Sequence, residues 1–127
     1  MEDKLILCVD DDELIIKLLD IMLRPKGYQI ESNLGGVGAY EKAKELQPGC
    51  IILDIMMPKI DGWKVLDSLK KDPETSGIPV IVLSVKSAPE DVERLMEMGA
   101  ARHIAKPFEA VDLVKAIEEL MAAPAQG

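Results

Sequence analysis

The chain has 127 residues, of which 48% are hydrophobic and 30% are charged, a size and composition typical of one globular domain with a single core. Its 15 lysine and arginine residues against 23 aspartate and glutamate residues leave a formal net charge of −8, which argues against direct binding to nucleic acid or to an anionic membrane. No apolar run is long enough to span a bilayer and no signal segment opens the sequence, so a cytoplasmic location is expected.

Apolar strands and amphipathic helices alternate along the chain. The predicted strands are 4–9, 28–32, 51–53, 78–84 and 102–106, and the predicted helices are 14–24, 39–46, 62–71, 89–98 and 109–121. This alternation predicts an α/β fold, a doubly wound five-stranded parallel sheet of the flavodoxin-like order 2-1-3-4-5. Residues 1–121 then form one domain, and residues 122–127 are expected to be a tail or the stub of a linker.

Two other patterns are better explained by packing or turns than by chemistry. Cys8 and Cys50 lie in apolar strands and form no CxxC pair, so they are predicted to be buried thiols and not a disulfide or metal site. The glycines of residues 35–38 match neither the GxGxxG pattern nor a loop ending in Gly-Lys-Ser/Thr. They are therefore predicted to form a turn with left-handed backbone angles and not a phosphate-binding loop.

Charged or hydroxyl-bearing residues end, or directly follow, four of the predicted strands. They are Asp10, Asp11, Asp54, Ser84 and Lys106. In the order 2-1-3-4-5, strands one, three, four and five are consecutive neighbours, and their carboxyl ends meet at one crevice of the kind where ligands bind. The sequence therefore predicts a single site at this end of the sheet, while Asp12 is predicted to cap the first helix.

The residue types at this crevice suit the handling of a phosphoryl group. Three carboxylates repel one another unless a cation lies among them, and oxygen-only ligands favour Mg²⁺ over zinc. Beside that ion, Lys106 can neutralise phosphoryl oxygens and Ser84 can donate a hydrogen bond to one of them. Asp54 can then attack phosphorus and form an aspartyl phosphate.

Several motifs of the chain also occur together in one known family. They are Val9-Asp10-Asp11, residues 54–58 with Asp61-Gly62, residues 79–84, Gly99-Ala100 and Lys106-Pro107-Phe108. In these motifs the sequence resembles the receiver domain of two-component response regulators, over residues 5–121. The resemblance implies that Asp54 accepts a phosphoryl group from a phosphohistidine on a histidine kinase or a histidine phosphotransfer protein. Such a domain catalyses only its own phosphorylation and dephosphorylation, so an enzyme in the usual sense is not expected.

The resemblance also implies roles for the other site residues. Asp10 and Asp11 would hold magnesium together with Asp54 and the backbone carbonyl of Met56. Lys106 would contact the phosphoryl group, and the bond between Lys106 and Pro107 is expected to be cis. In addition, Ser84 would move to bind the phosphoryl group and reshape the face formed by the fourth helix, the fifth strand and the fifth helix, which a downstream effector protein or domain reads.

Two positions depart from the usual receiver pattern. Val85 follows Ser84 where a small residue is common, so it can crowd the phosphoryl group or narrow its access to solvent. His103 stands where an aromatic switch residue is usual, and it is either a partly buried strand residue or a working switch. As the only histidine of the chain, it can make the output face sensitive to pH near neutrality.

Three other functions fit parts of this pattern. A receiver-like protein-binding module that takes no phosphate would keep the fold, and Val85 slightly favours it. A magnesium-dependent phosphatase with an aspartyl nucleophile would need a carboxylate two residues after Asp54, where this chain has Met56. A flavodoxin-like electron carrier would need aromatic residues to stack on a flavin, and only 3% of the residues are aromatic.

The first predicted helix carries more apolar surface than packing on a sheet requires. Its apolar residues fill an arc of roughly 220° at 100° per residue, whereas a helix on a sheet buries little more than about 100°. Part of the excess is expected to lie against the last helix. The remainder, near Ile15, Ile16 and Leu19, is predicted to face outward as a docking patch for the protein that donates the phosphoryl group.

Overall fold

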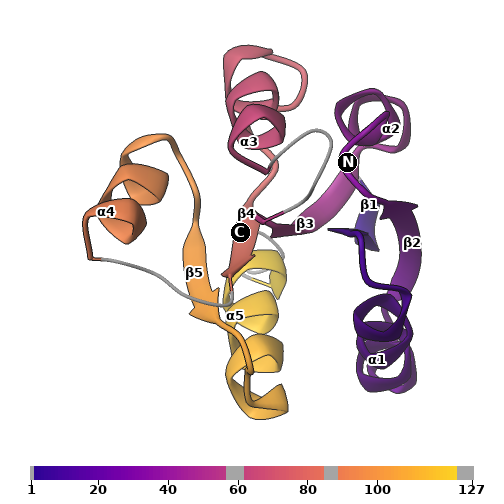
Figure 1. The fold of residues 1–127 in the computed structure, drawn as a ribbon. Coiled ribbons are helices and arrows are strands. Elements are labelled where there is room, and N and C mark those ends of the chain that lie inside the picture. The colour runs from indigo at the N-terminus through magenta and orange to yellow at the C-terminus, as the bar shows by residue number, and fades with distance from the viewer. Residues whose placement is uncertain (1, 57–61, 85–88, 123–127) are drawn as a thin grey trace.

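The computed structural model describes residues 2–56, 62–84 and 89–122. Its five parallel strands form one sheet in the order β2-β1-β3-β4-β5 (Figure 1), which confirms the predicted class and strand order. The strands are β1 (Glu2–Asp10), β2 (Gln29–Leu34), β3 (Pro48–Asp54), β4 (Val80–Ser84) and β5 (Arg102–Ala105). The helices are α1 (Glu13–Leu23), the 3₁₀ turn η1 (Arg24–Lys26), α2 (Ala39–Leu46), α3 (Gly62–Lys71), α4 (Pro89–Glu97) and α5 (Ala110–Ala122).

The predicted strand ends differ from the observed ones where backbone pairing, and not polarity, sets the boundary. The strand β2 continues to Leu34, because Asn33 and Leu34 still pair with Val9 and Asp10 of β1. By contrast, β4 begins only at Val80, since Pro79 has no backbone N–H to donate to the ladder. At the other boundary that matters for function, β1, β3 and β4 each end in a polar residue of the predicted site.

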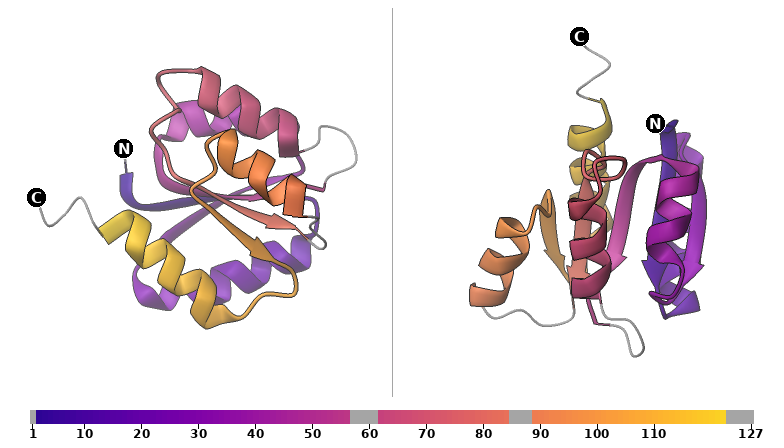
Figure 2. Two further views of the ribbon diagram at one scale, coloured as in Figure 1. Left: turned by 90° about the vertical axis from the view of Figure 1, so that its left-hand side faces the viewer. Right: turned by 90° about the horizontal axis from the view of Figure 1, so that it is seen from above.

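Helices cover both faces of the sheet and divide the core into two layers (Figure 2). One layer packs α2, α3 and α4 on strand residues such as Leu53 and Val82. The other packs α1 and α5 on their sequence neighbours, such as Ile52 and Leu83. This division follows from the alternation of side chains along a strand, and it explains why β3 and β4 are buried along their whole length.

Both cysteines lie in the layer under α1 and α5. Cys8 and Cys50 are free thiols with no exposed surface, as the sequence predicts. Burial raises the pKa of the Cys8 thiol and raises that of Cys50 to about 12. Both thiols therefore stay protonated at neutral pH and act as small apolar side chains.

The helix α1 buries a different face from the predicted one. Leu19 is only 1% exposed, so the prediction that it faces outward is wrong. Ile15 is half-buried and packs against the core, so it is at most partly available as an outward-facing residue. The stripe at Ile15, Leu19 and Leu23 has helical spacing and lies on the sheet. The residues that project into solvent are instead Leu14, Leu18 and Ile21, with exposed fractions of 73%, 43% and 69%.

The first residue of α3 lies unusually close to the end of β3. The Gly62 amide donates a 3.0 Å hydrogen bond to the carbonyl oxygen of Ile55. A Cβ atom at Gly62 would lie 2.5 Å from the carbonyl oxygen of Asp54 and closer still to the Cα of Ile55. Only glycine therefore lets α3 start directly against the strand end that carries Asp54.

We expect Gly62→Ala to lower the free energy of unfolding by about 1–3 kcal/mol, because backbone atoms at the end of β3 must shift to admit the methyl group. The matched control is Gly77→Ala, since a Cβ at Gly77 meets nothing within 4 Å. Urea denaturation of the two variants and the parent protein measures the difference. Equal midpoints for the two variants would show that the backbone can move aside without cost.

Candidate functional site

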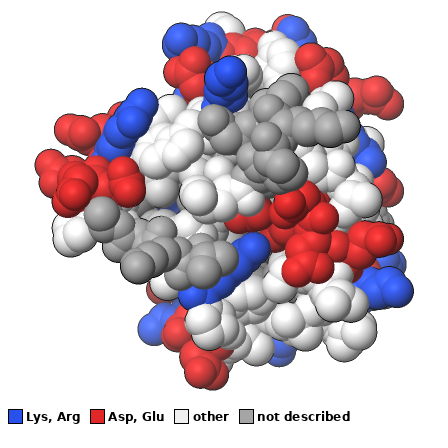
Figure 3. All heavy atoms as spheres, in the orientation of Figure 1, with Lys and Arg blue, Asp and Glu red and all other residues white. Residues whose placement is uncertain are grey.

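Three carboxylates come together at the carboxyl end of the sheet. Asp10 ends β1, Asp11 follows it and Asp54 ends β3, and one oxygen of each lies within 4.8 Å of the others. Asp10 and Asp54 are only 2% and 3% exposed, whereas Asp11 is exposed. Figure 3 shows acidic side chains gathered on one part of this face, with basic atoms close beside them. The convergence predicted from the strand ends is therefore present.

Backbone amides hold Asp10 in place. Its Oδ1 atom accepts a 2.9 Å hydrogen bond from the amide of Asp12, and its carbonyl oxygen accepts one of 2.9 Å from the amide of Gly35. Asp12 in turn accepts a 2.9 Å hydrogen bond from the amide of Leu14 and caps α1, as predicted. The end of β1 is thus tied to both α1 and the loop after β2.

Lys106 supplies the positive charge of the site. Its Nζ atom lies 3.0 Å from Oδ2 of Asp10 and 3.6 Å from Oδ1 of Asp54. Its backbone amide donates a 2.7 Å hydrogen bond to the carbonyl oxygen of Ser84, which ties the segment after β5 to the end of β4. The bond between Lys106 and Pro107 is cis, as expected. The amine predicted from the sequence therefore bridges two of the three carboxylates.

The electrostatic balance of this cluster raises the pKa of Asp54 to about 6. The largest cause is burial, followed by the negative charge of Asp10. The ammonium of Lys106 and a 3.2 Å hydrogen bond from the Met56 amide to Oδ1 act in the opposite direction. Burial and carboxylate repulsion therefore outweigh the single amine, which leaves the site short of positive charge.

The donor set fits a divalent magnesium ion. Three carboxylates and one ammonium sum to −3 + 1 = −2, and the side-chain ligand atoms grouped here are carboxylate oxygens of Asp10, Asp11 and Asp54. The described residues bring no cysteine or histidine into this cluster, and oxygen-only ligands are the kind that magnesium prefers.

Ser84 and His103 form a hydrogen-bonded pair that the sequence did not reveal. Ser84 Oγ and His103 Nε2 lie 2.8 Å apart. His103 is opposite Val82 in the pairing of β4 with β5, so Ser84, two residues further along, lies diagonally across on the same face of the sheet. His103 is half-buried and Ser84 is 2% exposed. A contact of this kind depends on the strand register, which the sequence analysis did not specify.

A model of the response regulator receiver domain matches residues 6–118 of the chain. The chain belongs to the response regulator receiver domain family. Among curated proteins, this receiver is 34% identical over 116 residues to the DNA-binding dual master transcriptional regulator RpaA of Synechocystis sp., covering 91% of this chain and 48% of the relative. It is 37% identical over 109 residues to the DNA-binding response regulator MtrA of Mycolicibacterium paratuberculosis, covering 86% of this chain and 47% of the relative. The receiver thus spans about half the length of these relatives.

Solved structures agree with this assignment. The receiver domain of a signal transduction histidine kinase from Syntrophus aciditrophicus is 35% identical with a TM-score of 0.86, and the match covers 94% of this chain and 91% of that chain. A response regulator from Desulfuromonas acetoxidans is 31% identical with a TM-score of 0.83, covering 94% and 97% respectively. The family assignment therefore confirms the predicted receiver domain over the two alternatives, a flavodoxin-like electron carrier and an aspartyl-nucleophile phosphatase.

Part of the receiver pattern lies outside the described residues. This holds for Met57, Pro58 and Asp61, which follow Asp54, and for Val85, which follows Ser84. The expected effect of Val85 on the phosphoryl group therefore stays a prediction. Met56 is described, and its side chain is 63% exposed while its amide contacts Asp54.

The sequence analysis missed the contribution of the loop between β2 and α2. The side-chain amide of Asn33 donates hydrogen bonds to the carbonyl oxygens of Gly35 (2.7 Å) and Val37 (3.0 Å), and so orders this loop of the receiver. Gly35 and Gly38 have positive φ angles of 87° and 81°, as the expected turn requires. An asparagine directly before a glycine-rich turn was the available signal. The loop contributes the backbone amide of Gly35 to Asp10.

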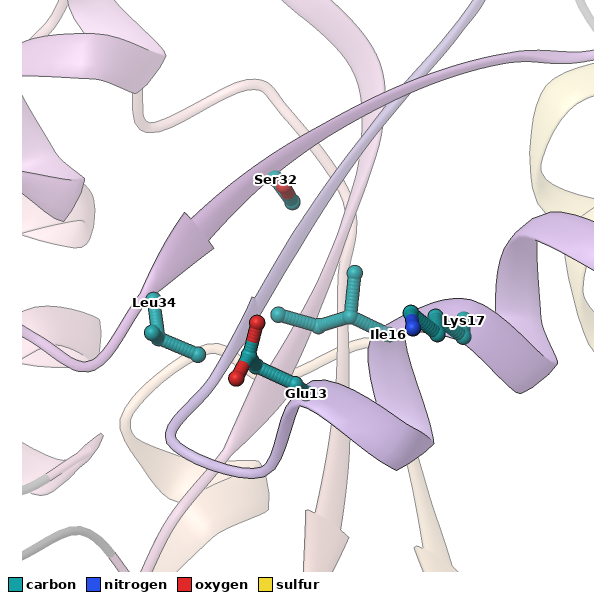
Figure 4. Close-up of a pocket in the computed structure, with 5 residues that line it drawn as sticks. All are labelled: Glu13, Ile16, Lys17, Ser32 and Leu34. Carbon is teal, nitrogen blue, oxygen red and sulfur yellow. The ribbon is translucent and has the colours of Figure 1, made fainter.

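A shallow groove lies between α1 and β2, close to the exposed apolar side chains of α1. It has a volume of about 210 Å³ and is lined by Glu13, Ile16, Lys17, Ser32 and Leu34 (Figure 4). Ile16 is half-buried here, as is Ile15 on the same helix, so of the three residues predicted for the docking patch only Leu19 is fully buried. The apolar surface that α1 offers is thus made by Leu14, Leu18 and Ile21 on the helix, with Leu34 of β2 at 59% exposure beside the groove.

We expect Asp54→Asn to stabilise the metal-free receiver at pH 7 by about 2–3 kcal/mol, because the folded state raises the pKa of this carboxyl from 3.8 to about 6. A raised carboxyl pKa contributes stability below pH 4 that is lost as the pH rises through 6. The gap between the variant and the parent should therefore open between about pH 4 and pH 6.5. Urea denaturation in chelator measures it.

The control for this measurement is Glu45→Gln, an exposed carboxyl on α2 that is not part of the cluster. Its unfolding free energy should follow that of the parent protein at every pH. A constant difference between Asp54→Asn and the parent protein across this range would contradict the crowding of carboxylates described above.

Proposed function

We propose that this receiver takes a phosphoryl group on Asp54 from a phosphohistidine donor, in a reaction that needs magnesium. The observation that carries the proposal is the position of Asp54: it is buried at the end of β3, 3.6 Å from the ammonium of Lys106 and within reach of the Asp10 and Asp11 carboxylates. This position leaves a nucleophilic oxygen on a rigid element, next to groups that can balance phosphoryl charge.

In the proposed reaction an Asp54 oxygen attacks phosphorus, a new O–P bond forms, and the P–N bond to the donor imidazole breaks. The electron pair of that bond returns to the imidazole nitrogen, which takes up a proton. The ammonium of Lys106, which contacts the carboxylates of Asp10 and Asp54, would then pair with the oxygens of the phosphoryl group. Asp10, Asp11, Asp54 and the carbonyl of Met56 would hold magnesium. When bound, this ion supplies positive charge to the phosphoryl oxygens as they approach.

The response to phosphorylation is proposed to start at Ser84. Its hydroxyl lies at the end of β4, one residue beyond the pairing of Asp54 with Leu83, and its carbonyl oxygen binds the Lys106 amide. A hydroxyl in this place can donate to a phosphoryl oxygen and carry a change from Asp54 to β4 and β5. The surface that changes would be the one formed by α4, β5 and α5.

Incubation with a small phosphodonor and magnesium should add the mass of one phosphoryl group to the intact protein. The adduct should be labile to hydroxylamine, as expected for an acyl phosphate. Asp54→Asn should show no adduct, whereas Glu45→Gln should match the parent protein. An unchanged mass gain in Asp54→Asn would place the modification on another residue, and no gain in the parent protein would favour a receiver-like module that takes no phosphate.

The proposed partners are a histidine kinase or a histidine phosphotransfer protein upstream and an effector protein or domain downstream. The relatives RpaA and MtrA are named as DNA-binding regulators, and the receiver spans about half of their length. A net charge of −8 argues that any DNA contact is made by another domain or chain, so the expected absence of nucleic-acid binding is proposed for the receiver alone. None of its described helices combines the length and the apolar character needed to cross a membrane.

The protein donor is proposed to dock on the exposed apolar side chains of α1, which begins three residues after Asp10. We expect Leu14→Ser to slow transfer from a protein donor about tenfold. The donor would lose apolar contact with the first turn of α1, which is the turn nearest the site. Transfer from a small phosphodonor should be unchanged, because Leu14 is 73% exposed and is not part of the carboxylate cluster.

The control for docking is Met96→Ser on α4, a side chain with 43% exposure in the other layer. It should leave transfer from the protein donor unchanged. Equal rates for Leu14→Ser and the parent protein with both kinds of donor would remove α1 from the docking surface.

A further inference from the structure

A shallow groove between α3 and α4 lies apart from the carboxylate cluster. It has a volume of about 500 Å³ and is lined by Trp63, Lys64 and Asp67 of α3, by Arg94 of α4 and by Met98, the residue directly after α4. None of these five side chains belongs to the carboxylate cluster. The groove lies on the α3 side of α4, so it is also separate from the surface of α4, β5 and α5 that is proposed to change on phosphorylation.

The lining of this groove has the composition of a protein-binding surface. Trp63 and Met98 are half-buried and pack against the core layer under α2, α3 and α4, so the core fixes their positions before any partner binds. The guanidinium carbon of Arg94 lies 4.7 Å from the centre of the Trp63 ring, a cation–π contact that holds this exposed side chain at the groove. Tryptophan, methionine and arginine are enriched in the cores of protein interfaces, and tryptophan and arginine are enriched among their hot spots.

The charge along the groove is opposite in sign to that of the whole receiver. Lys64, Arg94 and Asp67 sum to +2 − 1 = +1, whereas the chain has a net charge of −8. Asp67 also lies 2.9 Å from Nζ of Lys71, so its carboxylate is already balanced within α3. Arg94 forms no ion pair with any residue that the structure describes, although α4 also carries acidic residues. Arg94 therefore offers its positive charge to a partner.

We propose that this groove binds an acidic segment of another protein. An aromatic or long apolar side chain of that segment lies against Trp63 and Met98, and its carboxylates pair with Arg94. A small ligand would leave much of its surface in water in so shallow a groove, whereas ligand pockets bury most of the ligand. The net charge of −8 opposes a nucleic acid as the occupant. Binding of this kind needs no phosphoryl group, so it goes beyond the proposed reaction of Asp54.

Trp63 gives a readout confined to the groove, because it is the only tryptophan of the chain. The probe is a capped peptide with one phenylalanine between pairs of glutamates, and the comparison peptide has lysines in place of the glutamates. We expect the acidic peptide to shift the indole Nε1–H signal of Trp63 in a saturable way, with a dissociation constant of about 1 mM. The lysine peptide should leave the signal unchanged. Added salt should weaken binding of the acidic peptide, since its carboxylates meet an exposed guanidinium.

Arg94→Ala should weaken binding of the acidic peptide about tenfold, because the peptide carboxylates lose the charge beside the Trp63 ring. The matched control is Arg24→Ala, which removes the same charge from η1 at the end of α1, where Arg24 is paired with Asp20. This control should bind the acidic peptide like the parent protein. Both variants should show the full phosphoryl mass gain, since neither arginine belongs to the carboxylate cluster.

Several results would overturn the proposal. Equal binding of the glutamate and lysine peptides would show that the groove does not select acidic segments. Equal weakening by Arg94→Ala and Arg24→Ala would show that overall charge, and not the groove, attracts the peptide. No indole shift at about 5 mM peptide would exclude a segment of this chemistry. An indole signal that moves with protein concentration alone would assign the groove to a second copy of this chain. Each of these results would leave phosphorylation of Asp54 standing.

Discussion

The interaction on which the site depends is the contact of one lysine with two buried carboxylates. Lys106 Nζ lies 3.0 Å from Asp10 and 3.6 Å from Asp54, while a third carboxylate, that of Asp11, remains beside them. One ammonium cannot neutralise three carboxylates, and the pKa of Asp54 is raised by its burial first and by the charge of Asp10 second. The buried, mutually repelling carboxylates therefore destabilise the fold at the end of the sheet where the phosphoryl group would bind. The apolar core layers on both faces of the sheet offset this loss of stability.

Backbone groups make this cluster rigid before any phosphoryl group arrives. Amides of Asp12 and Gly35 fix Asp10, the amide of Met56 contacts Asp54, and the carbonyl oxygen of Ser84 binds the Lys106 amide. Each of these contacts joins the end of one strand to a neighbouring loop or strand. Local chain geometry thus places the side chains, and little rearrangement of Asp10 or Asp54 is needed for them to act together.

The residues of the site could be predicted from the sequence because they follow apolar strands whose order is restricted by the handedness of the connections. The face of α1 that packs inward could not be predicted in the same way. An apolar arc of roughly 220° contains several possible buried stripes, so nothing local distinguishes Leu18 from Leu19. The pairing of Ser84 with His103 depends on the register of β4 and β5, and the close approach of Gly62 to Asp54 depends on the path of the backbone. Such contacts arise from tertiary packing alone.

The division of the core into two layers has a consequence for how such a receiver can change its partners over evolutionary time. The exposed apolar side chains of α1 belong to the helix layer of α1 and α5, whereas Ser84 and His103 lie on the face of the sheet covered by α3 and α4. Among the residues that the structure describes, no buried core side chain is shared between the two layers. Mutations that retune recognition on α1 therefore leave the packing around Ser84 untouched. A receiver can therefore acquire a new phosphodonor by mutation of α1 while the residues around Ser84 stay the same. The sheet separates selection on donor recognition from selection on the response at Ser84.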